Sequence, residues 1–260
     1  MAAQVRSEKH GAVGLIVFDH PERHNAVSID MWRQIPAVAA ELDADPAVRV
    51  VIMRGAGDAA FVAGADISQF QESRREDNVG DYDRDNDRAY KALSNISKPV
   101  IAMIHGYCIG GGVALALSAD MRYAADDARL GIPAARLGLG YGMGGIEVLA
   151  QLVGYSNAKE IFFTAKRFSA AEALTMGLLN GVYAKDRLET EVMAIAETIA
   201  KNAPLTLRSV KMAVHELQKP SAARNVDAVK RATEACYASE DYAEGVSAFM
   251  EKRTPRFKGR

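Results

Sequence analysis

The sequence predicts an α/β fold that ends in a helical region. Two short runs, residues 48–53 and 100–104, are apolar and β-branched, which is typical of strands buried on both faces of a sheet. A helical pattern or a glycine turn separates each run from the next element, which indicates repeated βαβ units with right-handed crossovers. From Ser156 onward, most of the chain has helical spacing and capping residues.

The first third of the chain predicts a strand, a helix and a second strand. The apolar run at 13–18 meets the turn-prone stretch DHPERHNA and reads as a strand. Ser28 suits a helix N-cap, and the apolar spacing after it predicts a helix up to Leu42. Pro36 removes one donor inside that helix. The run at 48–53 supplies the second strand.

The middle of the chain predicts a loop, a third strand and another helix. Dense mixed charge over residues 69–90 leaves little apolar face, so we expect a mobile surface loop that becomes helical near Tyr90. The third strand, 100–104, is followed by a glycine turn and a helix. The last third then predicts helices at 158–165, 169–177, 188–201 and 206–218. We expect two regions, an α/β core over 1–200 and a C-terminal helical region over 201–260.

Composition and charge narrow the function. The chain has 260 residues, and its 32 Lys and Arg nearly balance its 33 Asp and Glu, so no overall field attracts nucleic acid or an anionic membrane. Neither the histidines nor Cys108 and Cys236 have the spacing of a metal site, so we expect no metal. The chain lacks a signal-peptide pattern and a long apolar run, which predicts a cytoplasmic protein.

Two glycine-containing turns indicate a site for negative charge. Residues 110–112 are three glycines between a buried strand and a helix, where free backbone N–H groups and the helix dipole favour an anion. The alternative is that these glycines only form a tight turn and allow close packing. The stretch 60–67 also follows a strand and ends in small residues. Two such turns could face each other.

Four stretches in order carry a resemblance to a known family: RHNAV from Arg23, FVAGADI from Phe61, HGYCIGGG from His105 and LGLGYGMGG from Leu137. FSAAEA, MGLLN and the closing FMEKRTPRF extend the likeness through the helical tail. By these motifs the chain resembles the enoyl-CoA hydratase/isomerase (crotonase) superfamily. The resemblance implies a spiral of repeated ββα units. It also implies a homotrimer or dimer of trimers assembled through the C-terminal helices.

The resemblance implies an acyl-CoA substrate and an oxyanion hole. The backbone N–H groups of Ala65 and Gly111 would point at the thioester oxygen and stabilise an enolate. Coenzyme A enters as part of the substrate, and no other cofactor is expected. The residues expected along the CoA are Arg23, Ala26, Ala63, Asp66 and Lys252, the last of them from a neighbouring subunit or from the same chain. Arg23 and Lys252 could instead be solvated surface charges.

The chain departs from the hydratases of this family at two catalytic positions. Where those enzymes place two glutamates to activate water, this sequence has Ala114 and Ala134. Tyr141 stands where methylmalonyl-CoA decarboxylases of the superfamily also carry a tyrosine, although their polar histidine in the first turn is Ala65 here. Decarboxylation needs no general base, because loss of CO₂ itself delivers electrons into the thioester. We therefore favour a lyase reaction, decarboxylation or a related one.

Glu147 keeps other reactions open. A carboxylate in the first turn of a helix is explained by dipole complementarity alone. If Glu147 instead faces the pocket, it could move a proton for double-bond isomerisation or serve a hydratase with displaced catalytic groups. A third possibility is an acyl-CoA binder without catalysis.

Overall fold

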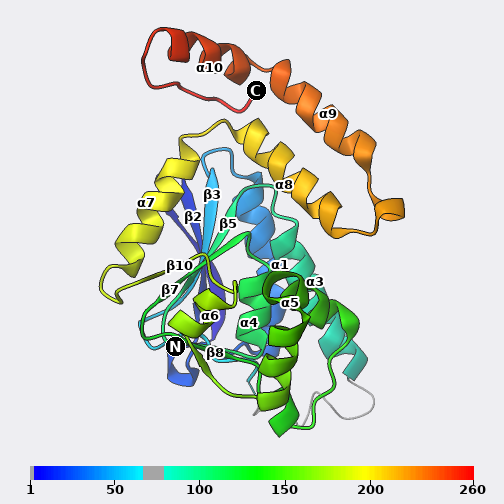
Figure 1. The fold of residues 1–260 in the computed structure, drawn as a ribbon. Coiled ribbons are helices and arrows are strands. Elements are labelled where there is room, and N and C mark those ends of the chain that lie inside the picture. The colour runs from blue at the N-terminus through cyan, green and yellow to red at the C-terminus, as the bar shows by residue number, and fades with distance from the viewer. Residues whose placement is uncertain (1–2, 67–78) are drawn as a thin grey trace.

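The computed structural model describes residues 3–66 and 79–260, which form two sheets wrapped by helices (Figure 1). The larger sheet has the order β1-β2-β3-β5-β7-β10. Its strands are β1 (Gln4–His10), β2 (Val13–Asp19), β3 (Val50–Gly55), β5 (Val100–Ile104), β7 (Met121–Ala125) and β10 (Gly181–Tyr183). The smaller sheet has the order β4-β6-β8-β9. Its strands are β4 (Ala60–Val62), β6 (Tyr107–Ile109), β8 (Arg129–Gly131) and β9 (Phe168–Ser169).

The chain follows a spiral in which each turn adds one strand to each sheet. The pairs β3 and β4, β5 and β6, and β7 and β8 each place their first strand in the larger sheet and their second in the smaller one. A helix follows each pair, in order α3 (Val79–Ser94), α4 (Gly111–Leu117) and α5 (Met143–Thr164). Because β4, β6 and β8 run parallel, the loops that follow them leave the smaller sheet at one edge. This is the repeated ββα spiral that the sequence resemblance implied.

Both faces of the larger sheet are covered. Along β2, Ile16 and Phe18 belong to the main core, whereas Leu15 and Val17 belong to a second core under α7 (Leu188–Ala200). In the main core, α1 (Ile29–Ala44) begins as the sequence predicts, with the Ser28 hydroxyl accepting a hydrogen bond from the Met31 N–H at 3.3 Å. Pro36 is accommodated inside α1.

The helices after α7 form an arm at one end of the molecule (Figure 1). The arm consists of α8 (Pro204–Gln218), α9 (Val226–Tyr237) and α10 (Glu240–Met250), while the short α6 (Ala170–Thr175) belongs to the body. Polar contacts tie the arm to the sheet, among them Lys211 Nζ to Asp120 Oδ2 at 2.8 Å and Arg49 Nη2 to the Phe257 carbonyl at 3.1 Å. Helix α7 ends at Ala200, and the division of the chain into a core over 1–200 and a C-terminal helical region over 201–260 stays a prediction.

Some elements differ from the sequence prediction. Strand β1 was not expected, and β9 and β10 interrupt a region predicted to be helical. Helix α3 begins at Val79, within the stretch predicted as a loop up to Tyr90, because its few apolar residues fall on one face, where Ala89 and Leu93 are fully buried. Arg33 of α1 also pairs with Asp85 of α3 at 2.8 Å. The rest of the predicted loop, 69–78, lies outside the described residues.

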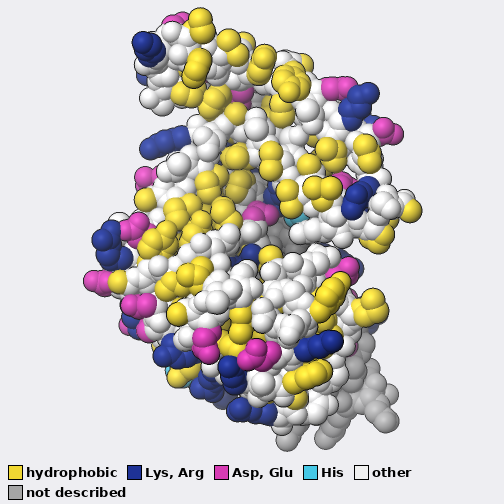
Figure 2. Space-filling view, in the orientation of Figure 1, with side chains coloured by type: hydrophobic (Ala, Val, Ile, Leu, Met, Phe, Trp, Pro, Cys, Tyr) yellow, Lys and Arg dark blue, Asp and Glu magenta, His cyan; other side chains and the backbone are white. Residues whose placement is uncertain are grey.

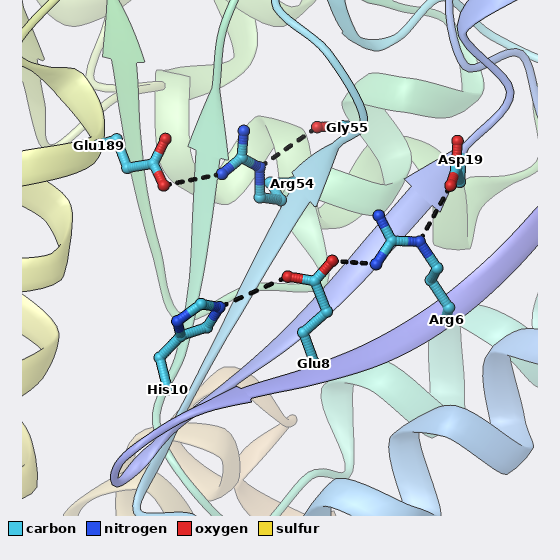
Figure 3. Close-up of polar contacts among 7 residues, drawn as sticks. All are labelled: Arg6, Glu8, His10, Asp19, Arg54, Gly55 and Glu189. Carbon is cyan, nitrogen blue, oxygen red and sulfur yellow. Dashed lines mark hydrogen bonds and ion pairs between the residues drawn. The ribbon is translucent and has the colours of Figure 1, made fainter.

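Ion pairs link the edge strand β1 to β2, and α7 to β3 (Figure 3). Arg6 of β1 donates to Asp19 of β2 at 2.9 Å and also pairs with Glu8. Arg54 of β3 pairs with Glu189 of α7 at 3.1 Å. These charges are partly exposed, so each pair contributes little to stability and mainly fixes the packing of the element that carries it.

His105, at the end of β5, is a buried imidazole that the fold keeps neutral. It is 6% exposed, and its Nε2 has no hydrogen-bond partner among the described residues. Burial, reinforced by the positive charge of Arg54, lowers the pKa of His105 to about 4.

Acidification should destabilise the protein through His105. Because its folded-state pKa lies below the unfolded value of about 6.5, the unfolded chain takes up the proton first. The stabilisation present above pH 6.5 is therefore lost as the pH falls toward 4. At about 1.4 kcal/mol per pH unit, the loss between pH 6.5 and 5 is roughly 2 kcal/mol. Urea unfolding of His105→Gln at pH 7.5 and 5 should show a pH dependence smaller by this amount. Equal pH dependence in the wild type and His105→Gln would contradict the assignment.

Candidate active site

The first turn of the site follows β4. Gly64 has φ of 109°, a value that residues with a side chain rarely adopt. It turns the chain immediately before Ala65. The loop before α1 holds this turn from the other side. The Val27 N–H donates to the Gly64 carbonyl at 2.9 Å, and the Asp66 N–H donates to the Val27 carbonyl at 3.0 Å. The turn is thus fixed by backbone hydrogen bonds from a segment nearly 40 residues away.

The second turn follows β6 and approaches the first very closely. A Cβ placed on Gly112 would lie 2.1 Å from the Val62 carbonyl oxygen, so only glycine fits there. The Gly110 N–H donates to the Gly131 carbonyl at 2.8 Å, which ties this turn to β8. The start of α4 is therefore pressed against the end of β4.

Ala65 and Gly111 are brought together by this packing. The position of a Cβ on Gly111 lies 3.7 Å from the Ala65 nitrogen. Gly111 is the first residue of α4, so its N–H lies outside the hydrogen-bond ladder of the helix. Within the described residues, neither the Ala65 N–H nor the Gly111 N–H has an acceptor. Two neighbouring backbone donors are thus available to a single oxygen atom.

Four of the five predicted CoA-binding residues cluster beside these turns. The Ala63 N–H donates to the His24 carbonyl at 3.0 Å, which places Ala63 against the loop that carries Arg23 and Ala26. Arg23 Nη1 lies 3.9 Å from Asp66 Oδ1. Lys252 does not join them within one chain, because it follows α10 in the arm, apart from α4 (Figure 1).

Asn25 is a structural residue of this cluster that the sequence prediction missed. It is 1% exposed and has φ of 57°. Its Nδ2 donates to the carbonyls of Ala56 and Ala60 at 2.9 and 2.8 Å, and its Oδ1 accepts from the His20 N–H at 3.0 Å. These bonds fasten the loop to both ends of the connection between β3 and β4. The only sequence signal for this structural role of Asn25 is its place in the turn-prone stretch DHPERHNA.

The positions of the missing glutamates offer no acid or base. Ala114 is half-buried in α4, and Ala134 is buried in the loop after β8. Cys108, in β6, is fully buried, and desolvation raises the pKa of its thiol far above its ordinary value. The titratable side chains expected at the site, Tyr141 and Glu147, belong to the segment around the start of α5.

Tyr141 and Glu147 lie where α5 begins. Glu147 is not in the first turn of the helix, where its charge would complement the helix dipole. Helix α5 begins at Met143, so Glu147 is its fifth residue and lies beyond the first turn. It is exposed, and Gln151 Nε2 donates to it at 3.5 Å. The expectation of a first-turn carboxylate is wrong, because Gly142 caps the helix and Gly144 and Gly145 lie inside it. The Tyr141 ring packs edge-to-face on Phe162 at 4.9 Å.

Fold and site together define a class. A two-sheet spiral of ββα units with two backbone donors at neighbouring strand ends is an α/β protein of the crotonase fold. The chain matches the family Enoyl-CoA hydratase/isomerase over residues 8–260. It therefore belongs to that family and is an acyl-CoA enzyme of the enoyl-CoA hydratase/isomerase superfamily.

Relatives and solved structures agree with this assignment. The chain is 35% identical over 251 residues to the short-chain-enoyl-CoA hydratase of Clostridium acetobutylicum, covering 95% of this chain and 94% of the relative. It is 34% identical to the peroxisomal Delta(3,5)-Delta(2,4)-dienoyl-CoA isomerase of Arabidopsis thaliana, covering 97% and 95%. The enoyl-CoA hydratase of Bacillus anthracis superposes with a TM-score of 0.91 at 32% identity, covering 98% and 99%. These names favour hydration or isomerisation over the decarboxylation we favoured from the sequence.

Proposed function

We propose that the protein is an enoyl-CoA hydratase or double-bond isomerase that stabilises a thioester enolate between Ala65 and Gly111. The observation that carries the proposal is the pair of neighbouring backbone N–H groups without an acceptor. As negative charge develops on the thioester oxygen, both donors strengthen their hydrogen bonds to it. One such donor contributes roughly 2.7–4 kcal/mol to transition-state stabilisation.

Glu147 is the group we assign to proton transfer. It is a carboxylate on the first half of α5, the helix that contacts α4 and follows the loop of Ala134. For isomerisation, its carboxylate would take a proton from the second acyl carbon and return one to the fourth. For hydration, it would take a proton from water as oxygen adds to the third carbon, then deliver that proton to the second carbon. One carboxylate suffices for either sequence.

Decarboxylation is the second candidate, and a specific observation favours it. With Ala114 and Ala134 at the usual glutamate positions, methyl groups stand where the hydratases of the family carry a base. An acyl group with a carboxylate on its second carbon could lose CO₂, leaving the electron pair in the enolate that the two donors stabilise. No base takes part, and Tyr141 would orient the leaving carboxylate.

Assembly is part of the proposal. Figure 2 shows hydrophobic side chains over the arm and on the adjacent part of the body. The exposed apolar residues of the arm include Leu217, Val226, Tyr237, Tyr242, Phe249 and Met250. Exposed apolar area of this kind typically marks a protein interface, which supports a homotrimer or dimer of trimers. In such an assembly Lys252 of one chain could reach the CoA of another.

A sedimentation experiment on the full chain tests the assembly. We expect a mass of three or six chains, because burying the apolar face of the arm between copies removes it from water. A monomeric mass at micromolar concentration would contradict this prediction.

Among the helices of the described residues, none has the length and apolar character required to cross a bilayer. A cytoplasmic location stays part of the proposal.

A turnover screen by mass spectrometry tests the reaction. The substrates are crotonyl-CoA, a 3-enoyl-CoA and methylmalonyl-CoA, each with wild type, Glu147→Gln and Tyr141→Phe. We expect water addition or double-bond migration that falls at least roughly 100-fold in Glu147→Gln, the scale of lost acid–base catalysis, and persists in Tyr141→Phe. Loss of CO₂ that depends on Tyr141 would support decarboxylation instead. Binding without turnover of any thioester would favour a non-catalytic binder.

The Gly111→Ala variant tests the oxyanion site with little effect on the fold. The added methyl meets Trp32 at 3.5 Å, an ordinary contact, yet lies 3.7 Å from the Ala65 nitrogen, in the space that the thioester oxygen would use. We expect kcat/KM to fall by roughly 100-fold or more with the melting temperature nearly unchanged. Gly245→Ala, in α10, is the matched control. Its added methyl also meets one side chain at 3.5 Å, that of Phe257. Full activity in Gly111→Ala would contradict the assignment.

A further inference from the structure

Trp32, the only tryptophan of the chain, lies directly against the two donor turns. It is on the first turn of α1 and is 1% exposed. The Cβ position of Gly111 that lies 3.7 Å from the Ala65 nitrogen also lies 3.5 Å from Trp32 Cζ2. One edge of the indole therefore adjoins the place where the two backbone donors converge.

The same edge of the indole carries a donor that the protein leaves unused. Trp32 Nε1 is buried and has no hydrogen-bond partner among the described residues. Nε1 and Cζ2 are bonded to the same ring carbon, so their hydrogens leave the ring on one side. Since Cζ2 adjoins Gly111, Nε1 belongs to the part of the ring nearest the two turns. Buried donors are rarely left unpaired, because their desolvation is then uncompensated.

The ring is held in this orientation from two directions. Tyr90 of α3 packs edge-to-face on it, with ring centroids 5.4 Å apart and planes at 74°. The start of α1 is fixed by Ser28, whose hydroxyl caps the helix, and by Val27, which pairs with Ala65. The indole and the first turn are thus parts of one rigid unit. A phenylalanine would fill much of the same space without bringing an unpaired N–H group.

We propose that the Trp32 Nε1–H donates a hydrogen bond to an oxygen on the third carbon of the bound acyl group. Such an oxygen and the thioester oxygen can lie next to each other on one side of the acyl chain. They would match the indole donor beside the two backbone donors. The site then selects acyl-CoA thioesters that are oxygenated at the third carbon over plain hydrocarbon chains. This inference rests on the proposed function, because it needs the thioester oxygen at Ala65 and Gly111.

Calorimetric titration with two CoA thioesters tests the proposal. Acetoacetyl-CoA and butyryl-CoA differ by one oxygen on the third acyl carbon. We expect the wild type to prefer acetoacetyl-CoA, and Trp32→Phe to reduce that preference about tenfold, which corresponds to about 1.4 kcal/mol. The affinity for butyryl-CoA should stay within about twofold. Tyr183→Phe, which removes one hydroxyl from an aromatic ring in the second core under α7, is the control and should keep the preference.

A second measurement needs no variant. The single tryptophan gives one indole N–H signal in a spectrum of protein labelled with ¹⁵N-tryptophan. Acetoacetyl-CoA should move its proton resonance downfield, as a new hydrogen bond does, and butyryl-CoA should move it much less. Equal shifts for the two thioesters, or an unchanged preference in Trp32→Phe, would overturn the role proposed for Trp32 and leave the proposed acyl-CoA site standing. If neither thioester binds, the acyl-CoA site itself is wrong.

Discussion

The close approach of Gly112 to the Val62 carbonyl is the constraint on which the rest of the site depends. With only a hydrogen on Gly112, α4 can begin against the end of β4, at a place where a methyl would lie 2.1 Å from a backbone oxygen. The parallel pairing of β4 with β6 holds the two strand ends level, and the larger sheet behind them fixes their spacing. The neighbouring N–H groups of Ala65 and Gly111 are a consequence of this backbone packing.

Because the donors are main-chain groups, the side chains around them are free to vary in chemistry. Ala65 contributes only its N–H to the proposed site, so the lack of a polar side chain there does not weaken the pair of donors. What the backbone donors require is rigidity, which comes from the loop before α1. Asn25 fastens that loop through three buried hydrogen bonds, and Val27 pairs with the first turn. In the proposed function, backbone geometry therefore stabilises the thioester enolate, whereas the particular reaction depends on side chains further along the acyl group.

Local signals made part of this structure predictable from the sequence. The β-branched run at 100–104 is a strand with those bounds, and Ser28 caps α1 as expected. The three-residue strands of the smaller sheet have no periodicity of their own and depend on pairing with distant segments. The motifs predicted that Ala65 and Gly111 lie close together. They did not predict that Trp32 contacts Gly111. That contact depends on where α1 packs, which no local pattern encodes. Glu147 was misplaced because glycines usually mark helix ends, whereas Gly144 and Gly145 lie inside α5.

The remaining choice among reactions reduces to which acyl carbon faces α5. With the thioester oxygen held by the two donors, as we propose, the second, third and fourth carbons extend from a point beside Ala65 and Gly111. Decarboxylation needs no protein group at the second carbon, so the methyl groups of Ala114 and Ala134 are compatible with it. Isomerisation requires one carboxylate to reach both the second and the fourth carbon, and hydration requires it to reach the second carbon and a water at the third. A single exposed carboxylate such as Glu147 can meet these demands only if the acyl chain curves toward α5. Under this proposal, the reaction is decided by the path of the acyl chain from the two backbone donors, and not by the donors themselves.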